Sequence, residues 1–319
     1  MSTDQIQTAL RYIRNNAGKY CCAPALAQLD SILRTQLFTE LFFERLEHKI
    51  GIVEQLHRQA NGNWNQTFYL LYFRTLGDSS NQENYLTLAQ TVTYSQILWE
   101  RQHPLAVEAL LLGGSGLLQL YPEDKYTQAL QTEFKKLAQK YGIRPMQPGD
   151  WMLDGIRPAN HPVLRLAQAA QFFSQNDFVM DRTMRCKCAK DIRQLFCIEA
   201  PEYWRTHYLP GVESSDRPKR IGMFKADIIG INLVTILQLA YSNYTNKDEL
   251  RANALALFER IPPEHNSYMD HWHAVGQIVP ANAFESQALL QLAKNYCNPR
   301  RCDQCPVGLQ IQALRKDKK

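Results

Sequence analysis

Apolar residues recur at helical spacing along almost the whole chain, and this pattern most limits the folds open to it. The same stripe runs through residues 24–59, 64–77, 104–142 and 160–173. In the first stretch its members, mostly three or four residues apart, are Leu26, Leu29, Leu33, Leu37, Leu41, Ile52 and Leu56. We expect Gly77 to end the second helix in a left-handed conformation. No β-hairpin signal or internal repeat interrupts the pattern, so the sequence predicts an all-α fold.

Two glycine-containing stretches break the stripe. The "GGSG" at residues 113–116 follows no strand and precedes no Lys-Ser or Lys-Thr pair, so it lacks the context of a phosphate-binding loop. We expect these small residues to let two helices pack closely. Residues 142–160 are rich in proline and glycine and have little periodicity. They predict a boundary between two packed helical subdomains, 1–150 and 151–319, in a bundle-like array that ends in a cysteine-rich loop.

The composition is that of a folded protein with a sizeable core. Of the 319 residues, 45% are hydrophobic and 21% are charged. No apolar run reaches the ~20 residues of a membrane span, and the first residues lack an apolar signal core. We therefore expect a cytoplasmic protein with no membrane partner, whose cysteines are reduced.

Three cysteines close together near the C-terminus predict a metal site. Cys297, Cys302 and Cys305 lie within nine residues, and the last two have the Cys-x2-Cys spacing of a zinc knuckle. Zinc is the expected metal and an iron–sulfur cluster the alternative, and either needs a further ligand. Candidates by residue type are Cys186, Cys188, Cys197, His207, His271 and His273. In the alternative without metal, Cys297 is a buried helix residue and the other two cap a turn.

Positive charge is concentrated at the same end of the chain. Residues 294–319 contain seven basic and two acidic residues, which accounts for the whole net charge of +5. The candidate phosphate contacts are Arg300, Arg301, Arg315 and Lys316. A solvated tail without a ligand is the alternative.

Several polar residues elsewhere could form a functional site. Arg157 and Asn160 could orient an anion, although Asn160 equally suits the N-cap of the next helix with Arg157 packed on it. His207 lies in a segment of aromatic and basic residues that suits base stacking and phosphate contacts, or any exposed loop. Glu264 and Asn266 are capable of acid–base chemistry, but they also fit an ordinary helix start.

Motifs throughout the chain resemble the bacterial family catalogued as domain of unknown function 2851. They are "FFERLEHK" (42–49), "VEALLLGGSGLL" (107–118), "IRPANHPVLRLAQ" (156–168), "YWRTHYLPG" (203–211), "GINLVTILQLAY" (230–241), "IPPEHN" (261–266) and "SQALLQLAKNYCNPRRCDQCPVG" (286–308). The resemblance implies a fold but no reaction. It also implies a nuclease-like region ahead of the first motif, which this chain is expected to lack, so a catalytic role is disfavoured.

Two functions from different classes remain. The sequence favours a non-catalytic helical module that associates with nucleic acid through a metal-stabilised basic C-terminal segment, because Arg300 and Arg301 lie inside the cysteine loop. The alternative is a helical scaffold that binds another protein, with structural cysteines. A hydrolase acting through His271, His273 and Glu264 is a remote third possibility.

Overall fold

The chain packs into two compact units, which we call unit 1 and unit 2. Unit 1 contains Met1–Ile52 and Ala252–Lys319, and unit 2 contains Val53–Arg251. The expected boundary at residues 142–160 falls inside unit 2, because helices on both sides of it pack together there. The computed structural model describes residues 20–77, 80–121 and 124–316.

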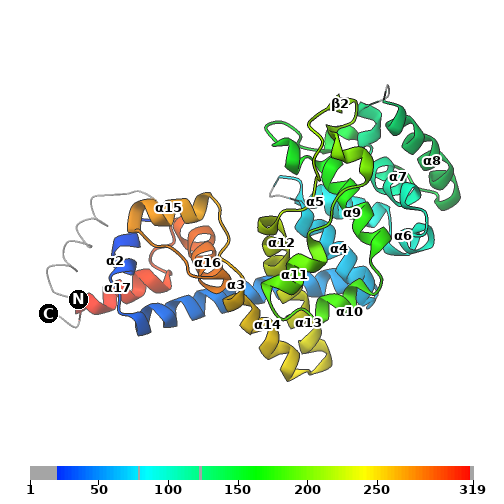
Figure 1. The fold of residues 1–319 in the computed structure, drawn as a ribbon. Helices are drawn as coiled ribbons and strands as arrows, with labels where there is room; N and C mark the ends of the chain where they lie inside the picture. Colours follow the sequence, from blue (N-terminus) through cyan, green and yellow to red (C-terminus); the bar gives the residue numbers. More distant parts are fainter. Residues whose placement is uncertain (1–19, 78–79, 122–123, 317–319) are drawn as a thin grey trace. The chain divides into compact units, whose positions relative to one another are not determined.

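Unit 2 is a helical array with one small hairpin among its described residues (Figure 1). It contains the end of α3 (Ser31–Gln59) and the start of α14 (Asp248–Arg260). Its other α-helices are α4 (Trp64–Leu76), α5 (Gln82–Thr91), α6 (Tyr94–Glu100), α7 (Pro104–Gly114), α8 (Lys125–Tyr141), α9 (Pro162–Gln175), α10 (Val179–Met184), α11 (Ala189–Phe196), α12 (Met223–Ile229) and α13 (Thr235–Thr245). Its 3₁₀ turns are η1 (Leu117–Leu120), η2 (Pro148–Asp150), η3 (Pro158–Asn160) and η4 (Glu202–Arg205), and a π-helical turn, η5 (Gly230–Val234), joins α12 to α13. The all-α prediction is confirmed.

Aromatic side chains from α4 and α9 form the core of unit 2. Tyr72 stacks on Phe172 with ring centroids 5.0 Å apart, and Phe73 stacks on Phe173 at 6.0 Å. These four rings are almost completely buried. Helix α9 is buried on all sides over its first nine residues, as its apolar composition requires.

Unit 1 is built from both ends of the chain. Its elements are α2 (Ala23–Ala27), the first part of α3 (Ser31–Gln59), the last part of α14 (Asp248–Arg260), α15 (Ser267–Gly276), α16 (Ala283–Gln291), the π-helical turn η6 (Leu292–Cys297) and α17 (Pro306–Lys316). Phe42 of α3 packs against Phe258 and Phe284, each with ring centroids 4.8 Å away. The expected single helix over residues 24–59 is two helices, because the Asp30 carboxylate accepts the Leu33 N–H at 2.9 Å and starts α3.

Two local expectations were wrong. Gly77 does end α4, but in an extended conformation with φ −64°, where an added Cβ would lie 2.8 Å from Gln82 Cα. A hairpin that the sequence pattern missed pairs β1 (His207–Leu209) with β2 (Val212–Glu213). Gly211 supplies the left-handed residue of its turn, with φ +73°.

The "GGSG" stretch permits close packing around the end of α7, as expected. A Cβ on Gly113 would lie 2.1 Å from the Phe134 ring of α8, and one on Gly114 would lie 2.6 Å from Val92. Gly116 has φ +77° and faces the Met146 carbonyl, 2.1 Å from where a Cβ would be. Close packing around the end of α7 is therefore the role of these glycines.

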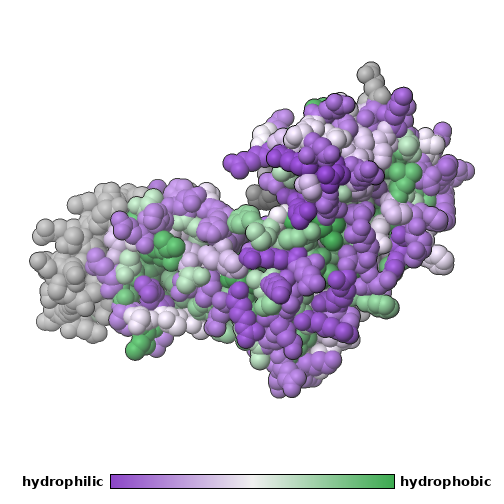
Figure 2. All heavy atoms as spheres, in the orientation of Figure 1, coloured by the Kyte–Doolittle hydropathy of each residue, from purple (hydrophilic) through white to green (hydrophobic). Residues whose placement is uncertain are grey.

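The continuous helical run Met223–Thr245 is long and apolar enough to cross a membrane by composition, with a mean hydropathy of 1.5. However, 72% of its most apolar window is buried inside the protein. Hydrophilic residues cover most of the visible face of this unit (Figure 2). The run has the position of a core helix.

We predict that Gly113→Ala destabilises the protein by about 1–3 kcal/mol, because the Phe134 ring must move to admit a methyl group. Gly51→Ala is the matched control. Gly51 lies within α3 with no atom within 4 Å of an added Cβ, so this change should stabilise the helix by up to about 1 kcal/mol. Urea unfolding of the two variants measures both values, and a neutral Gly113→Ala would contradict the packing role.

Candidate functional site

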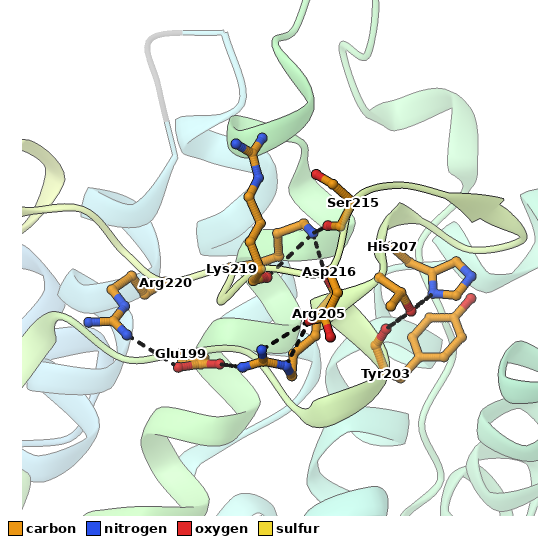
Figure 3. Close-up of polar contacts among 10 residues, drawn as sticks. Glu199, Tyr203, Arg205, His207, Ser215, Asp216, Lys219 and Arg220 are labelled. Atoms are coloured by element: carbon orange, nitrogen blue, oxygen red, sulfur yellow. Dashed lines mark hydrogen bonds and ion pairs between the residues drawn. The ribbon is translucent and has the colours of Figure 1, made fainter.

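Residues 199–220 of unit 2 form an irregular polar segment held together by its own side chains (Figure 3). Lys219 is only 4% exposed, and its Nζ donates to the carbonyl oxygens of Arg205, at 2.5 Å, and Ser215, at 3.1 Å. The ammonium group also lies 4.5 Å from the centre of the Tyr208 ring. Burial lowers the pKa of Lys219. The buried ammonium group therefore holds the loop together and does not face solvent.

Several charged groups of the same segment pair with one another. Arg205 forms ion pairs with Glu199 at 3.2 Å and with Asp216 at 3.0 Å. Arg220 lies 3.5 Å from Glu199, and Arg217 is placed over the Tyr208 ring. The basic and aromatic composition of this segment thus serves its own folding.

His207, a predicted polar site residue, is part of an aromatic stack in unit 2. Its ring stacks on Tyr203 at 4.2 Å, and Tyr203 stacks on Tyr126 at 4.0 Å. His207 Nδ1 lies 3.1 Å from the Tyr203 carbonyl oxygen (Figure 3). The Tyr203 hydroxyl donates to the Asp124 carboxylate at 3.0 Å. The ring and the Nδ1 atom of His207 are therefore both held by Tyr203.

Glu108 of α7 is a buried carboxyl group at the base of this stack. It is 1% exposed and accepts hydrogen bonds from Trp204 Nε1 and the Tyr126 hydroxyl, both at 2.8 Å. Burial raises its pKa to about 7, because the loss of hydration outweighs the effect of the two donors. Its charge state is therefore sensitive to pH near neutrality.

Asn160 contacts a buried arginine and does not cap the next helix. Its Oδ1 accepts from Arg165 Nη2 at 2.7 Å, while Arg165 Nη1 donates to Gln168 Oε1 at 2.9 Å. The cap of α9 is His161, whose Nδ1 accepts the Val163 N–H, so the expected cap was wrong by one residue. Arg157 is exposed beside η3.

In unit 1 a buried glutamine bonds to charged side chains from two other segments, α3 and the loop before α15. Gln287 of α16 is 1% exposed, and its Oε1 accepts from Arg45 Nε at 2.7 Å and Lys49 Nζ at 2.6 Å. Its Nε2 donates to Glu264 at 2.9 Å, and Asn266 Nδ2 donates to the other oxygen of Glu264 at 3.1 Å. Two cations therefore share one neutral oxygen, with one carboxylate beside them.

Lys294 is a third basic side chain close enough to influence the pKa of Lys49. Burial first, and then repulsion by Arg45 and Lys294, lowers the pKa of Lys49, while Glu264 opposes this shift. Lys294 is exposed, and its Nζ lies 5.5 Å from the centre of the Tyr268 ring. We call Arg45, Lys49 and Lys294 the cationic cluster.

Glu264, Asn266 and the two histidines of the predicted hydrolase site have partners or positions that do not suit a hydrolase. Asn266 is the N-cap of α15 and accepts the N–H groups of Tyr268 and Met269, as an ordinary helix start predicts. His271 and His273 are both exposed on α15. Glu264 is engaged by Gln287 and Asn266. These contacts do not assemble the remote hydrolase centre.

The C-terminal cysteines differ in exposure. Cys297 is half-buried at the end of η6, Cys302 is exposed, and Cys305 is buried just before α17. Within the described ranges, no three His, Cys, Asp or Glu side chains lie close enough to hold a metal ion. Of the ligand candidates in the sequence, Cys186, Cys188, Cys197 and His207 belong to unit 2.

The predicted phosphate contacts lie in and after the cysteine loop. Arg300 and Arg301 are exposed. Their backbone N–H groups donate to the carbonyl oxygens of Cys297 and Tyr296, respectively. Arg300 has a left-handed backbone with φ +59°. Arg315 and Lys316 lie in α17, and their side chains are outside the described ones, as are Lys318 and Lys319.

Sequence reasoning missed Arg45, Lys49 and Gln287. A weak signal was present, because residues four apart share one face of a helix and Arg45 and Lys49 lie inside the "FFERLEHK" motif. Their meeting with Gln287 depends on a contact between positions about 240 residues apart, which no local pattern reveals.

A family model described as "Protein of unknown function (DUF2851)" matches residues 1–267. The match thus includes Arg45, Lys49, Glu264 and Asn266, whereas the motif at residues 286–308 lies beyond it. No curated protein and no solved structure matches the chain.

We predict that the protein loses stability as pH rises from about 4.5 to 7, because Glu108 binds its proton more tightly in the folded chain than in the unfolded one. The stability that Glu108 contributes is fully present below the unfolded pKa, and about 3 kcal/mol of it has been lost once pH exceeds the folded value. Glu108→Gln should remove this dependence. The control Glu54→Gln changes an exposed glutamate of α3 and should leave the pH profile intact. Denaturant unfolding at half-unit pH steps gives the curves, and identical curves for wild type and Glu108→Gln would refute the assignment.

Proposed function

The chain belongs to this family of proteins of unknown function, and we propose that it is a helical module whose unit 1 associates with nucleic acid by binding phosphate groups. One observation carries the proposal. Arg45, Lys49 and Lys294 form a cationic cluster beside Glu264, and Arg45 and Lys49 both donate to the Gln287 oxygen. Because these cations repel one another at close range, an anion placed among them would be attracted by all three.

The hydrogen-bonding groups of the cluster suit a phosphate. Arginine and lysine are the side chains that most often contact phosphate oxygens, and Arg45 and Lys49 already converge on one oxygen atom, that of Gln287. A phosphate is negatively charged where the Gln287 oxygen is neutral, so it is the stronger acceptor for the same donors.

The C-terminal segment of unit 1 contains further cations. Arg300 and Arg301 display their side chains from the turn that follows η6. Arg315 and Lys316 follow in α17. Zinc or an iron–sulfur cluster at Cys297, Cys302 and Cys305 would stiffen this turn and so reduce the entropy lost when the arginines contact a backbone.

Unit 2 offers a useful contrast. Its basic segment pairs Arg205 and Arg220 with carboxylates and buries Lys219 among carbonyl groups. The proposal therefore assigns phosphate binding to unit 1.

We predict that the protein binds fluorescent 20-nucleotide DNA and RNA probes with an affinity that falls steeply with salt. Arg300→Gln/Arg301→Gln should weaken binding to all sequences alike and lower the slope of log K against log salt by about 2, roughly one unit per lost phosphate contact. Lys49→Gln should weaken binding by about tenfold, through loss of a charge-assisted hydrogen bond. Anisotropy titrations at several salt concentrations measure all three values.

The control is Lys135→Gln/Lys136→Gln, which removes two exposed cations from α8 of unit 2 and should leave affinity and slope unchanged. An equal loss in the control would mean that only net charge matters. Absent or salt-independent binding by the wild type would refute the proposal and favour the alternative of a helical scaffold for a protein partner. Circular dichroism of each variant separates loss of binding from loss of fold.

A further inference from the structure

A buried arginine near the start of α9 has only neutral hydrogen-bond partners. Arg165 is 7% exposed. Its Nη2 donates to Asn160 Oδ1 at 2.7 Å, and its Nη1 donates to Gln168 Oε1 at 2.9 Å. Both acceptors are uncharged amide oxygens. Among the residues that the structure describes, no carboxylate forms an ion pair with this guanidinium.

Such a charge calls for a partner, because buried charges in proteins are normally paired. Another arginine of unit 2 shows the normal arrangement. Arg193 donates to both carboxylate oxygens of Asp227, from Nε at 2.8 Å and from Nη2 at 2.7 Å. Burial lowers the pKa of Arg165, but a guanidinium stays protonated in proteins. Unit 2 therefore holds a positive charge that no described carboxylate neutralises by contact.

The two sides of this guanidinium differ in their access to solvent. Gln168, on the Nη1 side, is 1% exposed, and its Nε2 donates to the Lys219 carbonyl oxygen at 3.1 Å. Asn160, on the Nη2 side, is exposed in η3. Its backbone N–H donates to the Arg157 carbonyl oxygen at 2.8 Å, so a second, exposed arginine belongs to the same turn. A ligand would therefore reach Arg165 from the Nη2 side.

A buried hydroxyl without a partner belongs to the same region. Phe172 lies two helical turns after Arg165 on the same face of α9, and Tyr72 stacks on Phe172 with ring centroids 5.0 Å apart. Tyr72 is 1% exposed, and its hydroxyl has no hydrogen-bond partner among the described residues. Burial raises the pKa of this hydroxyl, and the charge of Arg165 opposes the rise. An anion is an acceptor that would stabilise both the unpaired cation and the unused donor.

We propose that Arg165 anchors a binding site for a small organic carboxylate in unit 2. The planar guanidinium matches the two oxygens of a carboxylate. One carboxylate oxygen replaces Asn160 Oδ1 as the acceptor for Nη2, and the exposed Arg157 attracts the ligand to the turn. A carboxylate brings one negative charge to one buried positive charge, whereas a phosphate dianion would bring an additional charge out of water. The low exposure of Arg165 admits only a small group.

The carboxylate site does not depend on the proposed function. Arg165 belongs to unit 2, whereas phosphate binding is assigned to unit 1. Carboxylate binding at Arg165 and nucleic-acid binding by unit 1 can therefore be measured separately, and either can fail without the other.

The test is NMR of the arginine Nε–H groups in the full chain labelled with ¹⁵N-arginine, titrated with acetate at constant ionic strength. The Arg165 signal, identified by its loss in Arg165→Lys, should shift and saturate with a dissociation constant of about 1–50 mM, as expected for so small a ligand. Acetamide, the uncharged analogue, should not shift it. Phosphate should shift the Arg45 signal of unit 1 more than that of Arg165. The matched control Arg144→Gln removes an exposed arginine of unit 2 and should leave acetate affinity unchanged.

Two further variants distinguish a binding site from an arginine that serves folding alone. Asn160→Ala removes the neutral acceptor that competes with the ligand and should tighten acetate binding by about threefold or more. Tyr72→Phe removes the unpartnered hydroxyl. It should raise the thermal midpoint of the free protein by about 2–4 °C and weaken acetate binding by about threefold. Both variants keep Arg165, so they remain informative if Arg165→Lys fails to fold.

Three results would overturn the proposal. The first is an Arg165 signal that responds to acetate no more than to acetamide or chloride. The second is a larger response of that signal to phosphate than to acetate. The third is an acetate affinity that stays the same in Asn160→Ala and Tyr72→Phe, which would leave Arg165 with a structural role only.

Discussion

Unit 1 depends on the hydrogen bonds of the buried Gln287 amide. A buried polar group left without a hydrogen bond costs about 1–3 kcal/mol, so both ends of this amide require partners. Its oxygen accepts hydrogen bonds from Arg45 and Lys49 of α3, and its nitrogen donates one to Glu264 in the loop before α15. One side chain thereby brings together three segments and collects the charges that make the unit a candidate for anion binding.

The two units use positive charge in different ways. In unit 2, Arg205 has two carboxylate partners, and Lys219 is enclosed by carbonyl oxygens. In unit 1, Arg45 and Lys49 converge on a neutral oxygen while repelling each other. Ion pairs within unit 2 stabilise its fold, whereas cations that gather at one neutral oxygen would attract a ligand that supplies negative charge.

The sequence alone determined what depends on neighbours along the chain. Helical periodicity predicted the all-α fold, and the spacing of Cys297, Cys302 and Cys305 identified a candidate metal loop. The helix start at Asn266 followed from the same local chemistry. Local rules failed by one residue at the cap of α9 and missed the short β1–β2 hairpin, because tertiary contacts there compete with weak propensities.

Only the tertiary structure decided which distant residues meet. It placed the unit boundaries elsewhere than the proline-rich stretch at 142–160. It also buried Lys219 and left Lys294 exposed. It also brought Gln287 to Arg45. Periodicity shows which face of a helix is buried, but the partner of that face is chosen by the packing of all the helices together.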